Sequence, residues 1–436
     1  MNDSSDRKQN KILRIVVMTV AVLALLAQII MIVPARTPRR PNSFTSDTVV
    51  LQWNAIATSK LPAGPPFPAT RIMAIVQLSV FEAVNATTGK YEPYLGTISA
   101  PAGASSEAAA VTAAHDALTA LLGASAALDN SRDASLATIP DGQAKTDGIA
   151  VGIAAAAAIV ANRTGDGSAP PLFYLPSNDD PYQWQITLPP YGACTAAGGA
   201  FRHWPNVRPF GIESASQFRA DPPPALTSGL YAHDLNEVKT VGELNSIERP
   251  QDRADVARLY AATGAELWNS ISTQIAATRN DDITDTARTL ALMNMAIADA
   301  AISVFDTKYF YKTWRPATAI ARADEDGNKW TEAAAFTPFI RTPCFPSYPS
   351  AHGSLSGAAR TVLERAYGRF KHSVTVSHPA VPGIVLNYTD LRTITDDIAD
   401  ARVYGGIHFR FDQDAGERQG HAIGQYEVNN LLQRKD

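Results

Sequence analysis

The sequence predicts an all-α protein built from one or more helical bundles. Apolar residues recur at helical spacing over most of the chain, and alanine fills long stretches, as in closely packed helices. No alternation of apolar and polar residues extends beyond a few positions. Hydrophobic residues make up 45% of the 436 residues and charged residues 18%, which suffices for a large core. The net charge of −4 gives no reason to expect a nucleic-acid partner.

The first 47 residues differ in character from the rest. Four basic residues between positions 7 and 14 precede the apolar run Ile15–Val33, which is long enough to span a bilayer and also resembles a secretory signal. We expect residues 1–47 to be a signal peptide or membrane anchor with a linker, and residues 48–436 to form an exported helical domain. Its location would be periplasmic, secreted or membrane-anchored outside the cytoplasm, and cleavage after Val33–Ala35 stays open.

The predicted elements follow in chain order. The irregular stretch from Gly165 to about Pro224 is rich in proline, glycine and aromatic residues, and loops of that length are usually functional or packed by their own side chains. The helices that periodicity predicts are Arg71–Ala86, Glu107–Leu122, Gly148–Ala161, Leu235–Leu244, Asp252–Ala277, Asp285–Asp306, Ala351–Tyr367 and Ala415–Leu432.

Two cysteines, Cys194 and Cys344, stand 150 positions apart. An exported compartment would permit a bridge between them. Their separation says nothing about contact, however, and the simpler expectation is two free buried thiols. No Cys-x-x-Cys pattern is present, which excludes a zinc knuckle or a thioredoxin-type site.

A first cluster of chemically active residues lies in the segment Lys308–Pro316. On a continuous helix, Lys308 and Arg315 would share one face about 10 Å apart, and Lys312 would join them. Such a face is often a solvated basic stripe. Here aromatic residues surround the cations, and a buried cation needs an anionic partner.

A second cluster is the segment Thr342–Gly353. Its three prolines predict an extended loop, and Ser350 is a good N-cap for the helix that follows. The Ser350 hydroxyl, free backbone N–H groups and His352 would then meet at a positive helix end, which suits an oxyanion. The simpler interpretation is an ordinary capped helix with an incidental histidine.

A third cluster is the segment Arg402–Asp412. On an unbroken helix, Arg402 and His408 would lie about 120° apart, but two glycines between them make a kink plausible. Asp412 follows His408 by four positions, the spacing at which a carboxylate can hold an imidazole nitrogen.

The order of the three clusters resembles the signature of the vanadium-dependent haloperoxidases and the related type 2 phosphatidic acid phosphatases. The pattern is Lys-x6-Arg-Pro, then Pro-Ser-x-His, then Arg-x5-His-x3-Asp. The resemblance extends from about residue 49 to the end, with residues 300–436 carrying the oxyanion site. Further similar segments are Trp53-Asn54, Ala69–Leu95, Val207–Phe210 and Leu235–Lys239.

The resemblance implies a vanadate cofactor bound covalently through His408, with Asp412 orienting the imidazole. Lys308, Arg315 and Arg402 would neutralise its oxygens, helped by the Ser350 hydroxyl and the Ala351 N–H. His352 would be the acid–base group, and Lys308 would also polarise the oxidant. Hydrogen peroxide, a halide and an organic acceptor would be the partners, and the protein could form a homo-oligomer.

The same side chains would serve a phosphatase, with His408 as nucleophile and His352 protonating the leaving alcohol. The three clusters alone do not separate the two activities, and the wider resemblance favours the peroxidase. A helical scaffold with an inactive site is the non-enzymatic alternative, but all the charged groups that the site needs are present.

Two departures from the family pattern bear on the site. Ala351 replaces the usual glycine between serine and histidine, and its methyl is expected to crowd the oxyanion; Ala401 replaces a serine before the second arginine. In the halide pocket that the resemblance implies, Phe345 matches the phenylalanine of chloride-oxidising members, whereas Phe305 stands where some of them carry tryptophan. We therefore expect activity toward iodide and bromide, and weak or no activity toward chloride.

Overall fold

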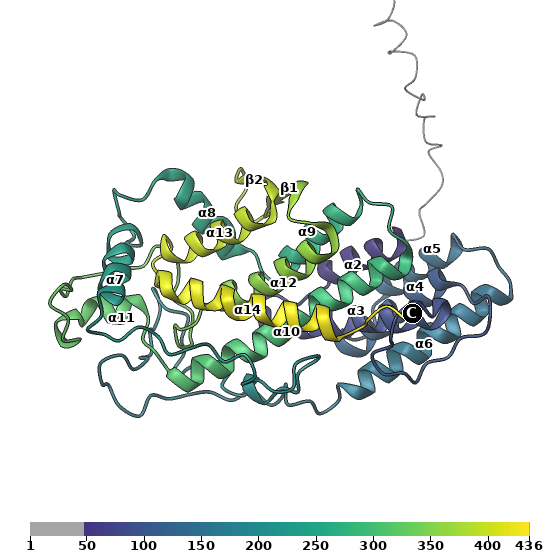
Figure 1. The fold of residues 1–436 in the computed structure, drawn as a ribbon, viewed down its shortest axis with the longest axis horizontal. Coiled ribbons are helices and arrows are strands. Elements are labelled where there is room, and N and C mark those ends of the chain that lie inside the picture. The colour runs from purple at the N-terminus through teal and green to yellow at the C-terminus, as the bar shows by residue number, and fades with distance from the viewer. Residues whose placement is uncertain (1–47, 436) are drawn as a thin grey trace, which may run out of the picture. The chain divides into compact units, whose positions relative to one another are not determined.

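Helices dominate the structure (Figure 1), as the periodicity predicts. The computed structural model describes residues 48–435. Its α-helices are α2 (Thr48–Ser59), α3 (Pro66–Thr88), α4 (Ser106–Leu122), α5 (Ala126–Ala137), α6 (Gln143–Asn162), α7 (Gly229–Val241), α8 (Gln251–Ala262), α9 (Glu266–Ala276), α10 (Ile283–Tyr311), α11 (Pro316–Ala321), α12 (Ala351–Tyr367), α13 (Leu391–Val403) and α14 (Arg410–Asn430). Two short 3-10 helices, η1 (Trp204–Asn206) and η2 (Ala323–Glu325), and the strands β1 (Phe370–Ser377) and β2 (Val385–Asp390) complete the described elements.

Helix α10 joins two groups of packed helices (Figure 1). It packs against α3, which belongs with α4 and α6, and against α12 and α14, which lie against each other. Asp282 caps its N-terminus by accepting from the backbone N–H groups of Thr284 and Asp285. Most of its residues are buried, and its many alanines let the neighbouring helices approach closely. This buried helix carries Lys308 into the interior.

Helix α10 does not continue through Arg315, so the prediction of one basic face on a continuous helix is wrong. Lys312 adopts a left-handed conformation (φ 53°) and caps the helix at Tyr311. Arg315 precedes a proline, which disfavours helical geometry, and becomes the extended N-cap of α11. Lys312 leaves the predicted face, and its Nζ lies 6.0 Å from the centre of the Tyr174 ring.

The predicted irregular stretch from 165 to 224 is confirmed, with η1 as its one described helical turn. It packs along the end of α10. There the backbone N–H of Trp184 donates to the Lys312 carbonyl, and the backbone N–H of Trp314 donates to the Tyr182 carbonyl. Cys194 and Cys344 form a disulfide, which corrects the expectation of free thiols. The bond ties this stretch to the loop before α12.

Helical periodicity does not predict the β-hairpin that follows α12. Strands β1 and β2 pair antiparallel, with Val374 opposite Tyr388. Alternate residues of β1 are buried. Strand β1 packs one face against the helical core, and the residues between its buried positions are exposed.

Several helix boundaries also differ. The predicted helix Asp252–Ala277 is divided into α8 and α9 by a break at Thr263-Gly264, where Thr263 is extended. Helix α14 begins at Arg410 rather than Ala415. The periodicity did not identify α2, α5, α11 or α13.

Three described helices, α3, α6 and α10, are long and apolar enough to cross a membrane by length and composition. For α3 and α10 the apolar stretch is 89% and 94% buried inside the protein, so packing in the core accounts for its composition. The predicted signal peptide or anchor lies outside the described residues.

Candidate active site

His408 lies between the end of α13 and the start of α14, where the glycine-rich break turns the chain. Helix α13 ends at Val403, and Gly406, with a positive φ of 78°, turns the chain so that the Arg402 charge acts on the His408 imidazole. His408 Nδ1 is 2.7 Å from Asp412 Oδ2. This carboxylate also accepts from the Ser347 hydroxyl at 2.6 Å and the Phe409 N–H at 3.3 Å. Asp412 thereby fixes the ring so that Nε2 carries the lone pair and faces Arg315.

Burial sets the protonation of this pair. Desolvation, followed by the charges of Arg315, Lys308 and Arg402, holds the pKa of His408 well below its ordinary value, so the ring is neutral near pH 7. Burial also raises the pKa of Asp412 to about 6, against the opposing effect of the Ser347 hydrogen bond. A neutral imidazole with one unprotonated ring nitrogen is the form that binds a metal.

Lys308, Arg315 and Arg402 are buried around His408. Lys308 Nζ donates to the carbonyls of Pro346, Ser347 and Pro349 at 2.5–2.9 Å, so its donors hold the loop before α12. Burial and the neighbouring Arg315 charge lower the pKa of Lys308 well below its ordinary value.

The two arginines keep free donors at this site. Arg315 donates through Nε to the Phe345 carbonyl at 2.9 Å, and its Nη1 lies 3.0 Å from His408 Nε2. Burial lowers the pKa of Arg315 to about 9 and that of Arg402 to about 10, so both are charged near neutral pH. Arg315 Nη2 and Arg402 Nε and Nη2 are buried and have no hydrogen-bond partner among the described residues. Such donors are costly unless an anion satisfies them, so this site fits an oxyanion.

The N-terminus of α12 completes the site. The Ser350 hydroxyl caps the helix by accepting from the Gly353 N–H at 3.2 Å, as predicted, and the Ser350 N–H donates to the Asp412 carbonyl at 2.8 Å. His352 Nε2 is 3.4 Å from Arg402 Nη1. Burial, then the charges of Arg402, Lys308 and Arg315, hold the pKa of His352 well below its ordinary value. A second neutral imidazole thus faces the same cations.

The two phenylalanines of the expected halide pocket take different places. The Phe345 ring centre lies 5.3 Å from Lys308 Nζ and 5.1 Å from the Arg315 guanidinium carbon. Phe305 is fully buried behind it, with the two ring centres 5.3 Å apart, and Phe67 packs against both. Phe345 therefore borders the cations, while Phe305 supports it from behind.

Direct contacts join the three sequence clusters. Arg315 meets His408, Arg402 meets His352, and Lys308 meets the carbonyl of Pro349. Of the predicted cluster residues, Lys312 is the one placed elsewhere. Sequence reasoning missed Ser347, whose hydroxyl holds Asp412. Its position inside the proline-rich loop was visible, but spacing alone does not show which hydroxyl reaches the carboxylate.

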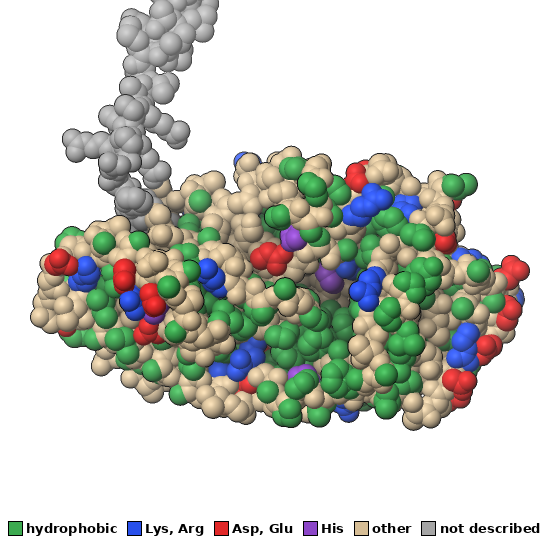
Figure 2. Space-filling model, turned by 180° about the vertical axis from the view of Figure 1, so that it is seen from behind, with side chains coloured by type: hydrophobic (Ala, Val, Ile, Leu, Met, Phe, Trp, Pro, Cys, Tyr) green, Lys and Arg blue, Asp and Glu red, His purple; other side chains and the backbone are tan. Residues whose placement is uncertain are grey.

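Two adjoining hollows reach His352. A small one of about 40 Å³ and a larger one of about 450 Å³ share Pro66, Thr263, Gly264, Ala265 and His352. Figure 2 shows a hollow in one face where histidine and basic side chains gather, with an acidic side chain and hydrophobic side chains nearby.

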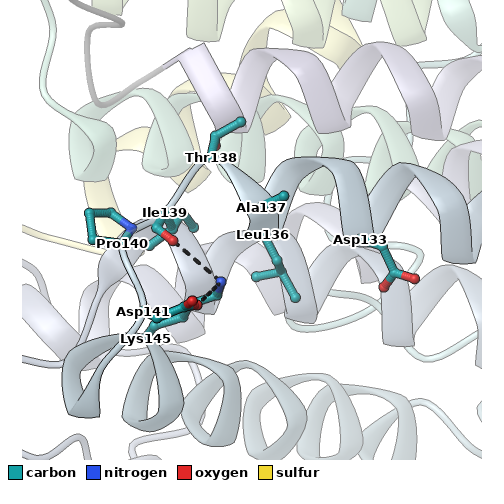
Figure 3. Close-up of a pocket in the computed structure, with 8 residues that line it drawn as sticks. All are labelled: Asp133, Leu136, Ala137, Thr138, Ile139, Pro140, Asp141 and Lys145. Carbon is teal, nitrogen blue, oxygen red and sulfur yellow. Dashed lines mark hydrogen bonds and ion pairs between the residues drawn. The ribbon is translucent and has the colours of Figure 1, made fainter.

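A separate open hollow of about 630 Å³ lies between α5 and α6 (Figure 3). Lys145 is the cation among its lining residues. Its Nζ donates to Asp141 at 2.9 Å and to the Ile139 carbonyl at 3.3 Å, so its charge is already matched. Around His408, by contrast, buried guanidinium nitrogens of Arg315 and Arg402 have no hydrogen-bond partner among residues 48–435.

Comparisons with known proteins agree with this geometry. Residues 288–434 match the family described as the VCPO second helical-bundle domain, a range that holds all three clusters. The vanadium chloroperoxidase of Curvularia inaequalis is 26% identical over 185 residues, which span 35% of this chain and 30% of that enzyme.

Solved structures extend the similarity over the fold. The crystal structure described as the first bacterial vanadium-dependent iodoperoxidase is 27% identical, with a TM-score of 0.72 over 92% of this chain and 99% of that one. The apo form of a bacterial vanadium-dependent chloroperoxidase is 16% identical and shares the fold, with a TM-score of 0.67 over 85% of this chain and 96% of that one. With the convergent site, these similarities support the resemblance of the chain to the vanadium-dependent haloperoxidase family.

Proposed function

We propose that the protein is a vanadate-dependent haloperoxidase, which oxidises a halide with hydrogen peroxide to hypohalous acid. The observation that carries this proposal is the set of buried guanidinium nitrogens without partners, on Arg315 and Arg402, beside a neutral histidine. The iodoperoxidase and chloroperoxidases that this chain resembles support the oxidative chemistry over ester hydrolysis.

The residues present fit vanadate. His408 would hold it through Nε2 and Asp412 would fix the ring, while Arg315, Arg402 and the Ala351 N–H would bind its oxygens. The Ser350 hydroxyl would add a donor, and Lys308 would add positive charge while it holds the loop. When bound, vanadate supplies Lewis-acid activation of peroxide without a change in its own oxidation state.

His352 would move the proton in this reaction. Its neutral ring faces Arg402 through Nε2, so this nitrogen is unprotonated and able to accept a proton from hydrogen peroxide. The nearby cations oppose a positive charge on the His352 ring, so the imidazolium readily returns the proton to a leaving hydroxide. Phe345 borders the cations with an apolar face and limits water beside them.

The direct test is an assay of the purified full-length protein with vanadate and hydrogen peroxide, with each halide in parallel with a phosphate monoester. We expect halide oxidation that requires both vanadate and peroxide, and little ester hydrolysis. Ester hydrolysis without halide oxidation would instead support a phosphatase with His408 as its nucleophile.

We expect the halides to react in the order iodide, bromide, chloride, with chloride weak or absent. Chloride is the hardest of the three to oxidise, and Phe305 and Ala351 both depart from the pattern of chloride-oxidising relatives. Halogenation of monochlorodimedone across bromide and chloride, with triiodide formation for iodide, measures the order. Chloride rates equal to those of bromide would contradict it.

Replacing Ala351 with glycine is expected to tighten oxyanion binding about twofold to tenfold. The Ala351 methyl lines the small hollow beside His352, and its removal lets the backbone N–H approach the oxyanion. One improved hydrogen bond of about 0.5–1.5 kcal/mol gives this range. Calorimetric titration with vanadate measures it, and equal or weaker binding would show that the pocket is adapted to alanine.

We also propose that the helical domain acts outside the cytoplasm, with residues 1–47 as its export signal or membrane anchor. The Cys194–Cys344 disulfide supports an oxidising compartment. Fractionation of cells that express the full-length protein tests this. Recovery of the protein in the cytoplasm with reduced cysteines would contradict it.

A further inference from the structure

The two hollows beside His352 differ in size and lining. The smaller, which we call the inner chamber, has about 40 Å³ of space and apolar walls that include Phe67, Trp268 and Leu355. This volume holds at most about three or four water-sized species, since one water needs at least about 10–15 Å³. Peroxide and a halide fit in the inner chamber, whereas an aromatic ring does not.

The larger hollow, which we call the vestibule, has about 450 Å³ of space, within the range of small-molecule sites. It is bordered by the end of α2, the turn that follows it, the α8–α9 break and the turn of the hairpin, which contributes His378. Much of its wall is apolar, including Leu61, Pro62 and Ala262. Organic molecules therefore fit here, next to the inner chamber.

Glu266 is the one carboxylate among the residues that line the vestibule. It lies in the first turn of α9, and its Oε1 accepts from the Gly264 N–H at 2.7 Å, which fixes the side chain over the α8–α9 break. A fixed carboxylate attracts cations and repels anions. Because the cations of the site lie deeper, around His408, the vestibule and the inner site favour opposite charges.

We infer that the vestibule binds the organic acceptor, and that this acceptor is an electron-rich aromatic molecule with a cationic amine. The inference rests on the proposed haloperoxidase function, which supplies hypohalous acid at His352. The acid transfers its halogen to a ring carbon: the carbon–halogen bond forms and the halogen–oxygen bond breaks. The ring carbon loses a proton, which joins the departing hydroxide as water. Glu266 is then a specificity-determining residue that holds the ammonium group.

The test compares two phenols of opposite charge, tyramine and 3-(4-hydroxyphenyl)propionate, in competition for iodination. Hypoiodite added without protein gives a reference ratio of iodinated tyramine to iodinated propionate. We expect this ratio to be higher with the native protein. Glu266→Gln keeps an oxygen for the Gly264 N–H but removes the charge, and should reduce this preference about threefold to fivefold, the scale of one partly exposed charge pair. The control Glu248→Gln removes an equal charge from an exposed side chain outside the vestibule and should leave the preference unchanged.

Two further measurements separate the possible failures. Triiodide formation without a phenol reports the peroxidase reaction alone, so its absence would count against the proposed function. Saturation-transfer NMR measures the binding of tyramine in the absence of peroxide. This binding depends on the vestibule alone and should weaken in Glu266→Gln. Two results would overturn the acceptor site. One is triiodide formation together with the same phenol preference as free hypoiodite. The other is tyramine binding that Glu266→Gln leaves unchanged.

Discussion

Replacing His408 with alanine is expected to abolish vanadate binding and all turnover that depends on it. The substitution removes the imidazole whose unprotonated Nε2 faces the Arg315 guanidinium and whose Nδ1 is held by Asp412. It also leaves three buried cations with no group to anchor their anion. Equilibrium dialysis with vanadate measures the loss directly, without reliance on activity.

His421→Ala is the matched control for this substitution. His421 lies on α14, like Asp412, but is exposed and bonds to Thr361, away from the cations. We expect this variant to bind vanadate as the native protein does. Vanadate binding by the His408 variant with native affinity would show that another group is the ligand.

Replacing His352 with alanine is expected to slow halide oxidation about 10²-fold to 10⁴-fold while vanadate binding is largely kept, the usual scale for a lost acid–base group. His352 contacts Arg402 at 3.4 Å and borders both hollows, so it meets the reactants without anchoring the anion. Steady-state rates and vanadate titration, measured on the same preparation, separate the two effects.

The pH profile gives this prediction a second readout. A base acts only when neutral, and burial with the nearby cations lowers the pKa of His352 below its ordinary value of 6.5. The rate of the native protein should therefore persist below pH 6.5 and fall as the pH drops through the lowered pKa. The His352 variant should lose this acidic limb. A loss of vanadate binding as large as the loss of rate would point to a ligand role instead.

The parts of the fold that local sequence determines were the ones that could be predicted. The N-cap at Ser350 and the four-residue spacing of His408 and Asp412 depend on a few neighbouring residues, and both are as expected. Helix α12 has the predicted bounds because a proline-rich loop precedes it and Gly368 follows it.

The remaining features depend on residues that are distant in sequence. Lys312 adopts a left-handed conformation that ends the helix of Lys308 before Arg315. Neither lysine nor arginine favours this conformation, so the sequence does not predict the helix end. Lys308 could not be assigned to the carbonyls of Pro346 and Pro349 before the loop was placed. The disulfide joins segments 150 residues apart, which no local pattern reveals.

Two elements, β1 and α13, have local sequence patterns that are too weak to predict them on their own. The alternation in β1 is a regular strand pattern, and α13 buries Leu391, Ile394 and Ile398 at helical spacing. Both elements are short and largely polar on their outer faces, so their apolar residues form a weaker pattern than those of α3 or α10.

A crystal structure of the protein with vanadate tests the central claim most directly, because the claim is the position of the anion. We expect density for one vanadate joined to His408 Nε2, with Arg315 Nη2 and Arg402 Nε and Nη2 as donors to its oxygens. Those three nitrogens would then all have partners. Vanadate bound elsewhere, with these nitrogens still unpaired or occupied by a carboxylate of the chain, would contradict the account.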